Sequence, residues 1–266
     1  MSKIENLLKL MWEDYIKLSP QAKNIVKLLE REGEEVVNDH IALRTFNHPK
    51  VCIDIIAKPF IEAGYVDSGE YHFEEKKLYA KHFQHPNEDY PKVFISELLL
   101  EKFSPEFNQI IDSKISGLKP SAIADFNFSI SGRTWDLTVK EYSKLKKESD
   151  YGAWLSAIGY RPNHFTILIN KLKKFSDIRV LNEFLKDNGH KLNDAGGEVK
   201  GSEAVCLEQS STLADKIEID FDDSSLIIPS CYFEFAKRYI DHTGKFYQGF
   251  VATSADKIFE STNKSQ

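Results

Sequence analysis

The sequence predicts an α+β fold made of two βαβββ units, with helices before the first unit and between the two. The first support is a succession of one strand, one helix and three strands over 36–100, which returns over 161–240. The second is that both units open on an apolar strand with a histidine near its start, a weak internal repeat. The third is size: 266 residues, 41% of them hydrophobic, can bury one large core. We therefore expect a single metal-binding domain over 1–266.

Residues 1–35 are predicted to form two helices that cover or buttress the main fold. Apolar residues recur at helical spacing over 7–16. Ser19 followed by Pro20 is a typical helix start, and Gly33 marks the end of the second helix.

The first unit, over 36–100, begins with an alternating strand over 36–46. Because side chains alternate along a strand, His40 and Arg44 share one face of it. A helix is expected over 53–63, where Gly64 follows. The three remaining strands of the unit are expected near 71–74, 78–83 and 92–98.

Residues 101–160 interrupt this rhythm and are predicted to be a helical insertion. Its helical stretches are 107–115, 139–147 and 151–158.

The second unit, over 161–240, opens on a strand over 163–170 that carries His164. A helix over 176–188 ends before Gly189. Further strands are expected near 199, 204–208, 216–219 and 231–237, and a C-terminal segment follows over 241–266.

The charge and the hydropathy exclude several classes of protein. The formal net charge of -6 is spread along the chain, whereas a nucleic-acid-binding protein needs a clustered basic face. No stretch approaches the roughly 18 apolar residues of a membrane span, and the first residues lack the apolar run of a signal peptide. Three widely separated cysteines do not suggest a disulfide scaffold. We therefore expect a cytoplasmic protein with no nucleic-acid or membrane partner.

Two histidines and one carboxylate are the candidate metal ligands. His40 and His164 occupy matching places in the two units, so they can meet across the cleft between them. Glu234 lies in an apolar strand, where a carboxylate is costly unless a cation neutralises it. This donor set is the facial triad of non-haem Fe(II) oxygenases, which leaves positions for substrate and dioxygen. Manganese suits the same donors, and from the residues alone a purely structural role stays open.

Arg44 is the candidate substrate clamp. It lies four residues beyond His40 on the same face, about 13 Å along a strand. Its long side chain can shorten that gap, and a guanidinium binds carboxylates in a bidentate manner. A dicarboxylate held by the metal at one end could reach Arg44, unless Arg44 forms a structural salt bridge. Near the C-terminus, Ser254 is predicted to cap a helix whose start could bind an anion.

Three motifs follow one another along the chain: NDHIALRT over 38–45, NHFT over 163–166 and YFEFAKR over 232–238. Together they resemble the 2-oxoadipate dioxygenase/decarboxylase family, also called hydroxyglutarate synthase, over most of the chain. That family is similar to the vicinal-oxygen-chelate fold. The resemblance implies that the two units form a partly open β-barrel around a metal.

The resemblance also implies an activity. Fe(II) would bind a 2-oxo acid, and dioxygen would drive decarboxylation and hydroxylation of the same molecule. From 2-oxoadipate the products would be 2-hydroxyglutarate and carbon dioxide, a step in lysine breakdown. The implied site residues are His40, His164 and Glu234 for the metal, Arg44 for catalysis and substrate binding, and Thr253 and Ser254 for further substrate contacts.

Two other readings compete with an oxygenase. A glyoxalase-type lyase or isomerase would use more protein ligands, and Glu97, on the last strand of the first unit, could be the fourth. A non-catalytic small-molecule-binding protein on the same fold is the other alternative. Strand alternation also predicts that Phe165, Phe233 and Phe235 point away from the ligands and anchor their strands in the core.

Overall fold

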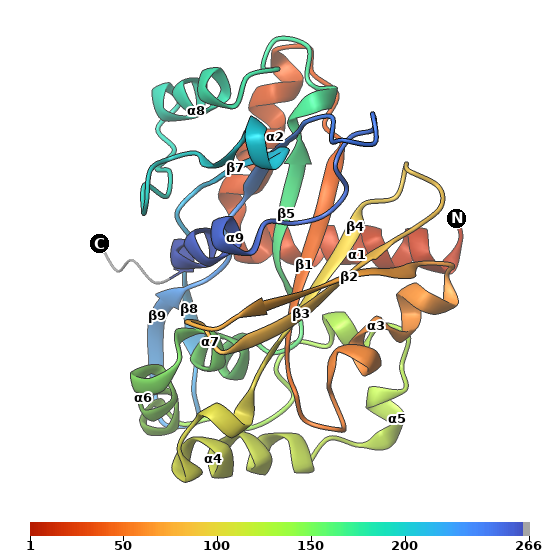
Figure 1. Cartoon of the computed structure of the whole chain (residues 1–266). Helices are drawn as coiled ribbons and strands as arrows, with labels where there is room; N and C mark the ends of the chain where they lie inside the picture. The colour runs from red at the N-terminus through yellow and green to blue at the C-terminus, as the bar shows by residue number, and fades with distance from the viewer. Residues whose placement is uncertain (263–266) are drawn as a thin grey trace.

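A curled eight-stranded sheet forms a half-barrel at the centre of the molecule (Figure 1). The computed structural model describes residues 1–262, apart from the side chains of residues 255, 256, 259 and 262. The strand order is β2-β3-β4-β1-β5-β10-β7-β6. The first four strands come from the first predicted unit and the last four from the second.

The two units have the same topology, so the predicted pair of βαβββ units is confirmed. In the first unit, β1 runs parallel to β4, and β2, β3 and β4 form an antiparallel meander. In the second, β5 runs parallel to β10, and β10 pairs antiparallel with β7. The first strands of the two units, β1 and β5, pair antiparallel in the middle of the sheet. This antiparallel pairing relates the units by an approximate twofold axis and places His40 opposite Thr166 and His164 opposite Ala42, so that the two histidines lie close together. The elements are β1 Asn38–Phe46, α3 Ile53–Glu62, β2 Val66–Phe73, β3 Leu78–Gln84 and β4 Lys92–Leu98, then β5 Pro162–Leu168, α8 Ile178–Asp187, β6 Lys200–Ser202, β7 Leu207–Ser211 and β10 Glu234–Arg238.

One predicted strand does not belong to the second unit. The segment near 216–219 is β8 Lys216–Asp220, which pairs with β9 Ser225–Pro229 in a separate two-stranded sheet. The position beside β7 is already occupied by β10, so this hairpin is an excursion between them. The strand expected over 231–237 begins only at Glu234, because the residues before it bond to the β7–β8 connection instead.

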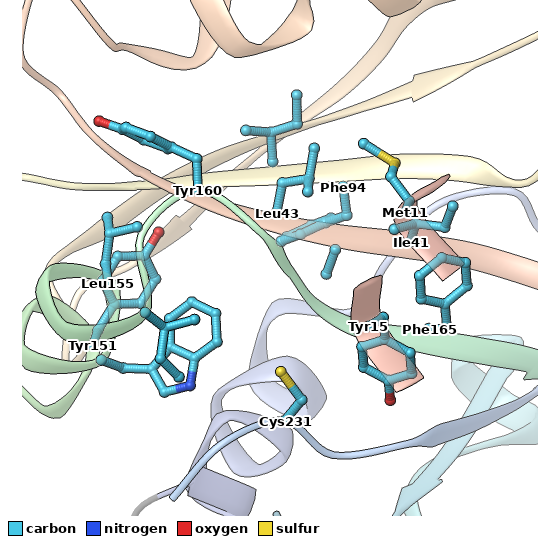
Figure 2. Close-up of a cluster of buried hydrophobic side chains, with 14 of the residues drawn as sticks. Met11, Tyr15, Ile41, Leu43, Phe94, Tyr151, Leu155, Tyr160, Phe165 and Cys231 are labelled. Atoms are coloured by element: carbon cyan, nitrogen blue, oxygen red, sulfur yellow. The ribbon is translucent and has the colours of Figure 1, made fainter. Parts of the chain in front are cut away.

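The N-terminal helices α1 Lys3–Leu18 and α2 Pro20–Arg31 match the prediction, and α1 acts as a buttress. Trp12 and Tyr15 pack against Phe165, with ring centroids 5.1 and 5.0 Å away. The Tyr15 hydroxyl donates to the backbone carbonyl of Tyr232. Phe165 points away from the face that carries His164, as strand alternation requires, and Figure 2 shows it packed with Tyr15 and Met11. The predicted core role of Phe165, Phe233 and Phe235 is confirmed by their burial.

The predicted helical insertion is confirmed and lies at one end of the molecule (Figure 1). Its last helix, α7, is buried over almost its whole length and presents Tyr151 and Trp154 to the sheet. The remaining helices are α4 Pro105–Ser116, α5 Pro120–Ile123, α6 Val139–Glu148, α7 Asp150–Ile158 and α9 Ala252–Phe259, with short 3-10 turns η1 Leu100–Lys102, η2 Phe128–Ile130, η3 Ile169–Lys171, η4 Glu203–Val205 and η5 Glu260–Thr262. Within the described part of the chain, every helix is too short or too polar to span a bilayer.

Candidate metal centre

Three neighbouring strands place the three candidate ligands on one face of the sheet. His164 on β5 lies two residues along from Thr166, the register partner of Glu234 on β10. His164 is also opposite Ala42 of β1, which is two residues along from His40. An even spacing keeps side chains on one face, so all three point into the half-barrel.

The donor atoms of these residues converge, since one from each lies within 4.8 Å of the others. His164 Nε2 is 3.2 Å from Glu234 Oε2, and His40 Nε2 is 3.6 Å from Glu234 Oε1. The two imidazole rings are nearly perpendicular, with centroids 5.5 Å apart. Two nitrogens and one oxygen that face a common point fit a divalent metal ion with several coordination positions left open.

The residue before each histidine orients its ring. His40 Nδ1 lies 2.8 Å from Asp39 Oδ2, and His164 Nδ1 lies 3.2 Å from Asn163 Oδ1. An oxygen at Nδ1 keeps the proton on that nitrogen, so each Nε2 presents its lone pair to the common point. The Gln209 amide donates to Glu234 Oε1 and holds the carboxylate in turn.

Burial shifts the pKa of each of the three candidate ligands. It lowers the pKa of His40, against the opposing effect of Asp39, and holds the pKa of His164 well below its usual range. Both imidazoles are therefore neutral near neutral pH, which is the form that can bind a metal ion. Burial raises the pKa of Glu234 to about 8, despite the Gln209 hydrogen bond. A buried carboxylate is stabilised as the anion by a metal ion at the same point, so the residues fit the implied metal.

Glu97 does not reach this site, so the structure gives no support to a fourth ligand there. In β4 the register position that corresponds to Glu234 is Phe94, opposite Ala42. Glu97 is three residues further and faces the other way, where it accepts a hydrogen bond of 3.0 Å from the backbone N–H of Ile53 at the start of α3. The ring of Phe94 occupies that position instead and packs against Phe250, with centroids 5.0 Å apart.

Arg44 lies inside the half-barrel beside the ligands. Its guanidinium stacks on the rings of Tyr151 and Trp154, 4.8 Å from each centroid. Among the described residues, its buried Nε and Nη1 have no hydrogen-bond partner, and neither has the hydroxyl of Tyr232. The Tyr232 ring stacks on His164 at 4.7 Å. Arg44 also lines a cavity of about 180 Å³ together with Lys76, Lys77 and Asp150. A buried cation with unused donors in this place suits an anionic ligand.

The segment after β10 meets the site through Phe250. The ring of Phe250 lies edge-on to His40, with centroids 4.8 Å apart. Ser254 is not a helix cap: Val251 precedes the first turn of α9, and no side chain caps it. The predicted cap was wrong because the helix begins three residues earlier than a cap at Ser254 requires. Thr253 is exposed, and both residues line an open cavity with Lys200, so their contact with substrate stays a prediction.

Several residues around the ligands escaped the sequence analysis. Asp39 and Asn163 could have been found, because each directly precedes a predicted ligand at the repeated position. Arg238 lies in the third motif and pairs with Asp39 from 199 positions away. That distance in sequence left no local signal, and the same holds for Gln209 and Phe250.

Comparisons with known proteins identify the family and the fold of this chain. A family model described as 2-oxoadipate dioxygenase/decarboxylase matches residues 1–246. A chloroplastic/amyloplastic 2-oxoadipate dioxygenase/decarboxylase of Oryza sativa subsp. japonica is 37% identical, over 95% of this chain and 76% of that protein. The crystal structure of an Oryza sativa hydroxyglutarate synthase in complex with 2-oxoadipate has a TM-score of 0.89 at 33% identity, and covers 98% of this chain and 94% of that one.

A crystal structure from Shewanella frigidimarina, provisionally named a hydrolase, is 51% identical with a TM-score of 0.91, over 95% of this chain and 99% of that one. A protein from Ralstonia eutropha, provisionally assigned to the glyoxalase superfamily, has a TM-score of 0.75 at 22% identity, which shows the fold alone. The fold expected from the motifs is thereby confirmed. By its sequence and its fold, the chain belongs to the 2-oxoadipate dioxygenase/decarboxylase family.

Proposed function

We propose that this protein is an Fe(II)-dependent enzyme that converts 2-oxoadipate and dioxygen to 2-hydroxyglutarate and carbon dioxide, as a step in lysine breakdown. The two products together contain the atoms of the substrate and of one dioxygen molecule. The observation that carries the proposal is the convergence of His40, His164 and Glu234 beside the buried Arg44. The names of the relatives supply the substrate, since one of them was crystallised with 2-oxoadipate.

The three converging residues would hold the metal, and when bound, Fe(II) would supply a site where a 2-oxo acid chelates and dioxygen is activated. Asp39 and Asn163 keep both imidazoles in the tautomer that binds. Gln209 holds the carboxylate of Glu234 in one orientation.

The remaining residues would orient the substrate. Arg44 would bind its distal carboxylate, because the guanidinium is charged, planar and without a carboxylate partner among the described residues. Tyr151 and Trp154 keep that guanidinium in one plane. Phe250 excludes water from the side of His40, which strengthens every polar contact inside. Thr253 and Ser254 stay proposed as further substrate contacts.

The experiment is oxygen uptake by protein loaded anaerobically with Fe(II), on addition of 2-oxoadipate, 2-oxoglutarate or pyruvate. We expect uptake that is selective for 2-oxoadipate and matched by carbon dioxide release. A Glu234→Gln variant is the control, because it keeps the size of the side chain and removes its charge. If no 2-oxo acid produces uptake while one metal ion is bound per chain, the oxygenase proposal fails and a lyase becomes the better reading.

A further inference from the structure

We infer that Arg238 is a positioning residue that joins the metal ligand His40 to a cover of the active site, the segment 247–251. The part of the inference that concerns the metal rests on the proposed function. The part that concerns the cover rests on contacts of the polypeptide alone.

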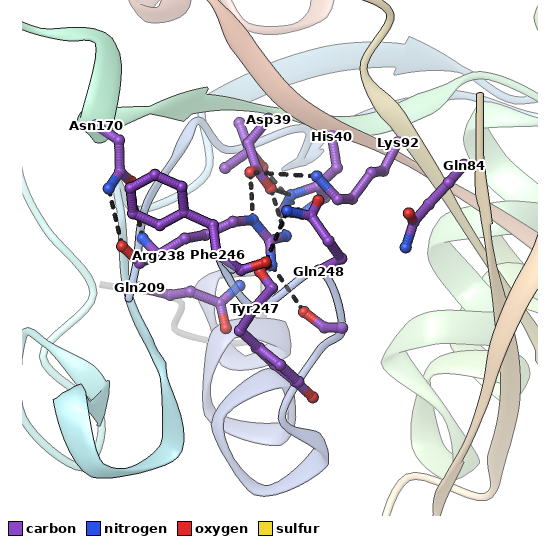
Figure 3. A network of polar contacts seen from close by, with 12 residues as sticks. Asp39, His40, Gln84, Lys92, Asn170, Gln209, Arg238, Phe246, Tyr247 and Gln248 are labelled. Carbon is purple, nitrogen blue, oxygen red and sulfur yellow. Dashed lines mark hydrogen bonds and ion pairs between the residues drawn. The ribbon is translucent and has the colours of Figure 1, made fainter. Parts of the chain in front are cut away.

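Arg238 grips the residue that orients His40. It lies at the end of β10 and is 3% exposed. Its Nε and Nη2 donate to the two carboxylate oxygens of Asp39 at 2.6 and 2.8 Å, a bidentate pair (Figure 3). Asp39 Oδ2 also lies 2.8 Å from His40 Nδ1, so the carboxylate that Arg238 grips is fixed behind the His40 ring.

The third nitrogen of the same guanidinium holds the cover. Arg238 Nη1 donates to the backbone carbonyls of Tyr247 and Gly249 at 2.8 and 2.9 Å. These bonds lead directly to Phe250, whose ring lies under the guanidinium, 5.4 Å from Cζ, and edge-on to His40. Residues 242–246 before the cover are exposed, whereas Phe250 is 5% exposed. One arginine thus fixes Asp39 and Phe250, which both contact the His40 ring.

The cover has a second anchor on the first unit. The backbone N–H of Phe250 donates to the hydroxyl of Tyr71 on β2 at 3.1 Å. Tyr71 is held by His82, 2.9 Å away. Tyr71 makes none of the described contacts to Asp39 or to the metal donors. The two anchors can therefore be separated: Tyr71 holds only the cover, whereas Arg238 holds the cover and orients a ligand.

The test measures the two roles separately in Arg238→Gln, Arg238→Lys and Tyr71→Phe. Hydrogen exchange of the peptide 247–251 in metal-free protein reports the cover. Anaerobic competition with a ferrous chelator reports the affinity for Fe(II). Arg179→Gln is the control, because Arg179 also pairs with a carboxylate, Glu208, but its side chain is 61% exposed.

Each variant has a distinct expected result. In Arg238→Gln the amides of the cover exchange roughly tenfold faster, since two hydrogen bonds are lost. The same variant binds Fe(II) about 10- to 100-fold more weakly, as expected when an outer partner of a ligand is removed. Arg238→Lys recovers most of the affinity for Fe(II), because the lysine ammonium still neutralises Asp39. The ammonium cannot bond the carbonyls of both Tyr247 and Gly249, so hydrogen exchange of the cover stays fast. In Tyr71→Phe the amides of the cover exchange faster than in the wild type, whereas the affinity for Fe(II) is unchanged. The control matches the wild type in both measurements.

The inference is overturned if the cover of Arg238→Gln exchanges at the wild-type rate. It is also overturned if Arg238→Lys and Arg238→Gln lose the same affinity for Fe(II). If Arg238→Gln does not fold, wild-type exchange in both Arg238→Lys and Tyr71→Phe overturns it instead. The exchange measurement needs neither metal nor turnover. If the cover amides exchange at the expected rates but no oxygen is taken up, the result counts against the proposed function and not against the role of Arg238 in holding the cover.

Discussion

Replacement of Arg44 by methionine should stabilise the metal-free protein and sharply lower its kcat/KM. Arg44 is 4% exposed, and no carboxylate pairs with it among the described residues. A buried ion costs several kcal/mol in desolvation. The two aromatic rings 4.8 Å away offset about 1–2 kcal/mol each. An apolar side chain of similar length avoids the cost that remains, about 1–3 kcal/mol.

In a chain of this size 1 kcal/mol corresponds to about 2–4 °C in Tm, so metal-free Arg44→Met should melt about 3–10 °C higher than the wild type. Its kcat/KM should fall between about 100-fold and several thousand-fold, the kinetic equivalent of a lost buried ion pair of 3–5 kcal/mol. Glutarate, a dicarboxylate without the 2-oxo group, should raise the Tm of Fe(II)-loaded wild type and leave that of the variant unchanged.

The assays are thermal unfolding with and without glutarate, and oxygen uptake against 2-oxoadipate concentration. Arg44→Lys is the companion variant, since it keeps the charge and loses the planar fork. A variant that melts lower than the wild type while it retains kcat/KM would refute the reasoning, because Arg44 would then be a structural residue.

Three further outcomes follow from the site and its supports. Glu234→Gln should lose the stabilisation by Fe(II), about 2.7 kcal/mol at 100 times Kd in the wild type, and an unchanged Tm shift on metal addition would contradict its role as a ligand. Glu97→Gln should keep both metal and turnover. Because burial raises the pKa of Glu97, the wild type loses stability as the pH rises through that value, whereas the amide of the variant does not titrate. Chemical denaturation between pH 4 and 8 should therefore show that the stability of the variant rises relative to that of the wild type as the pH increases. Tyr15→Phe should lower the free energy of unfolding by about 1 kcal/mol, because the carbonyl of Tyr232 loses its buried donor, and denaturant titration at constant slope tests this.

The sequence by itself determined the plan of the fold, because periodicity is a local property. Alternation around His40 and His164 identified the first strand of each unit, and their helices followed from helical spacing and closing glycines. The same alternation correctly turned Phe165 into the core and its neighbour His164 to the other face. The strand near 216–219, which is β8, was assigned to the wrong sheet because alternation identifies a strand but not the strand beside it.

The convergence of His40, His164 and Glu234 could be expected from the repeat, but their surroundings could not. Glu97 looked equivalent to Glu234 by order along the chain, and only the register of β4 against β1 showed that Phe94 has that place. Strand registers are set by pairing across the sheet, which the residues of one strand do not reveal.

The tertiary structure alone decided which partners surround the ligands. Arg238 and Asp39 are 199 positions apart, and Phe250 reaches His40 only because β1, β5 and β10 are adjacent in the sheet. Such contacts depend on how distant segments pack, and no local pattern encodes them. The residue types of the candidate metal centre were thus readable along the chain, whereas the pairing of strands placed them at one point and closed the site around them.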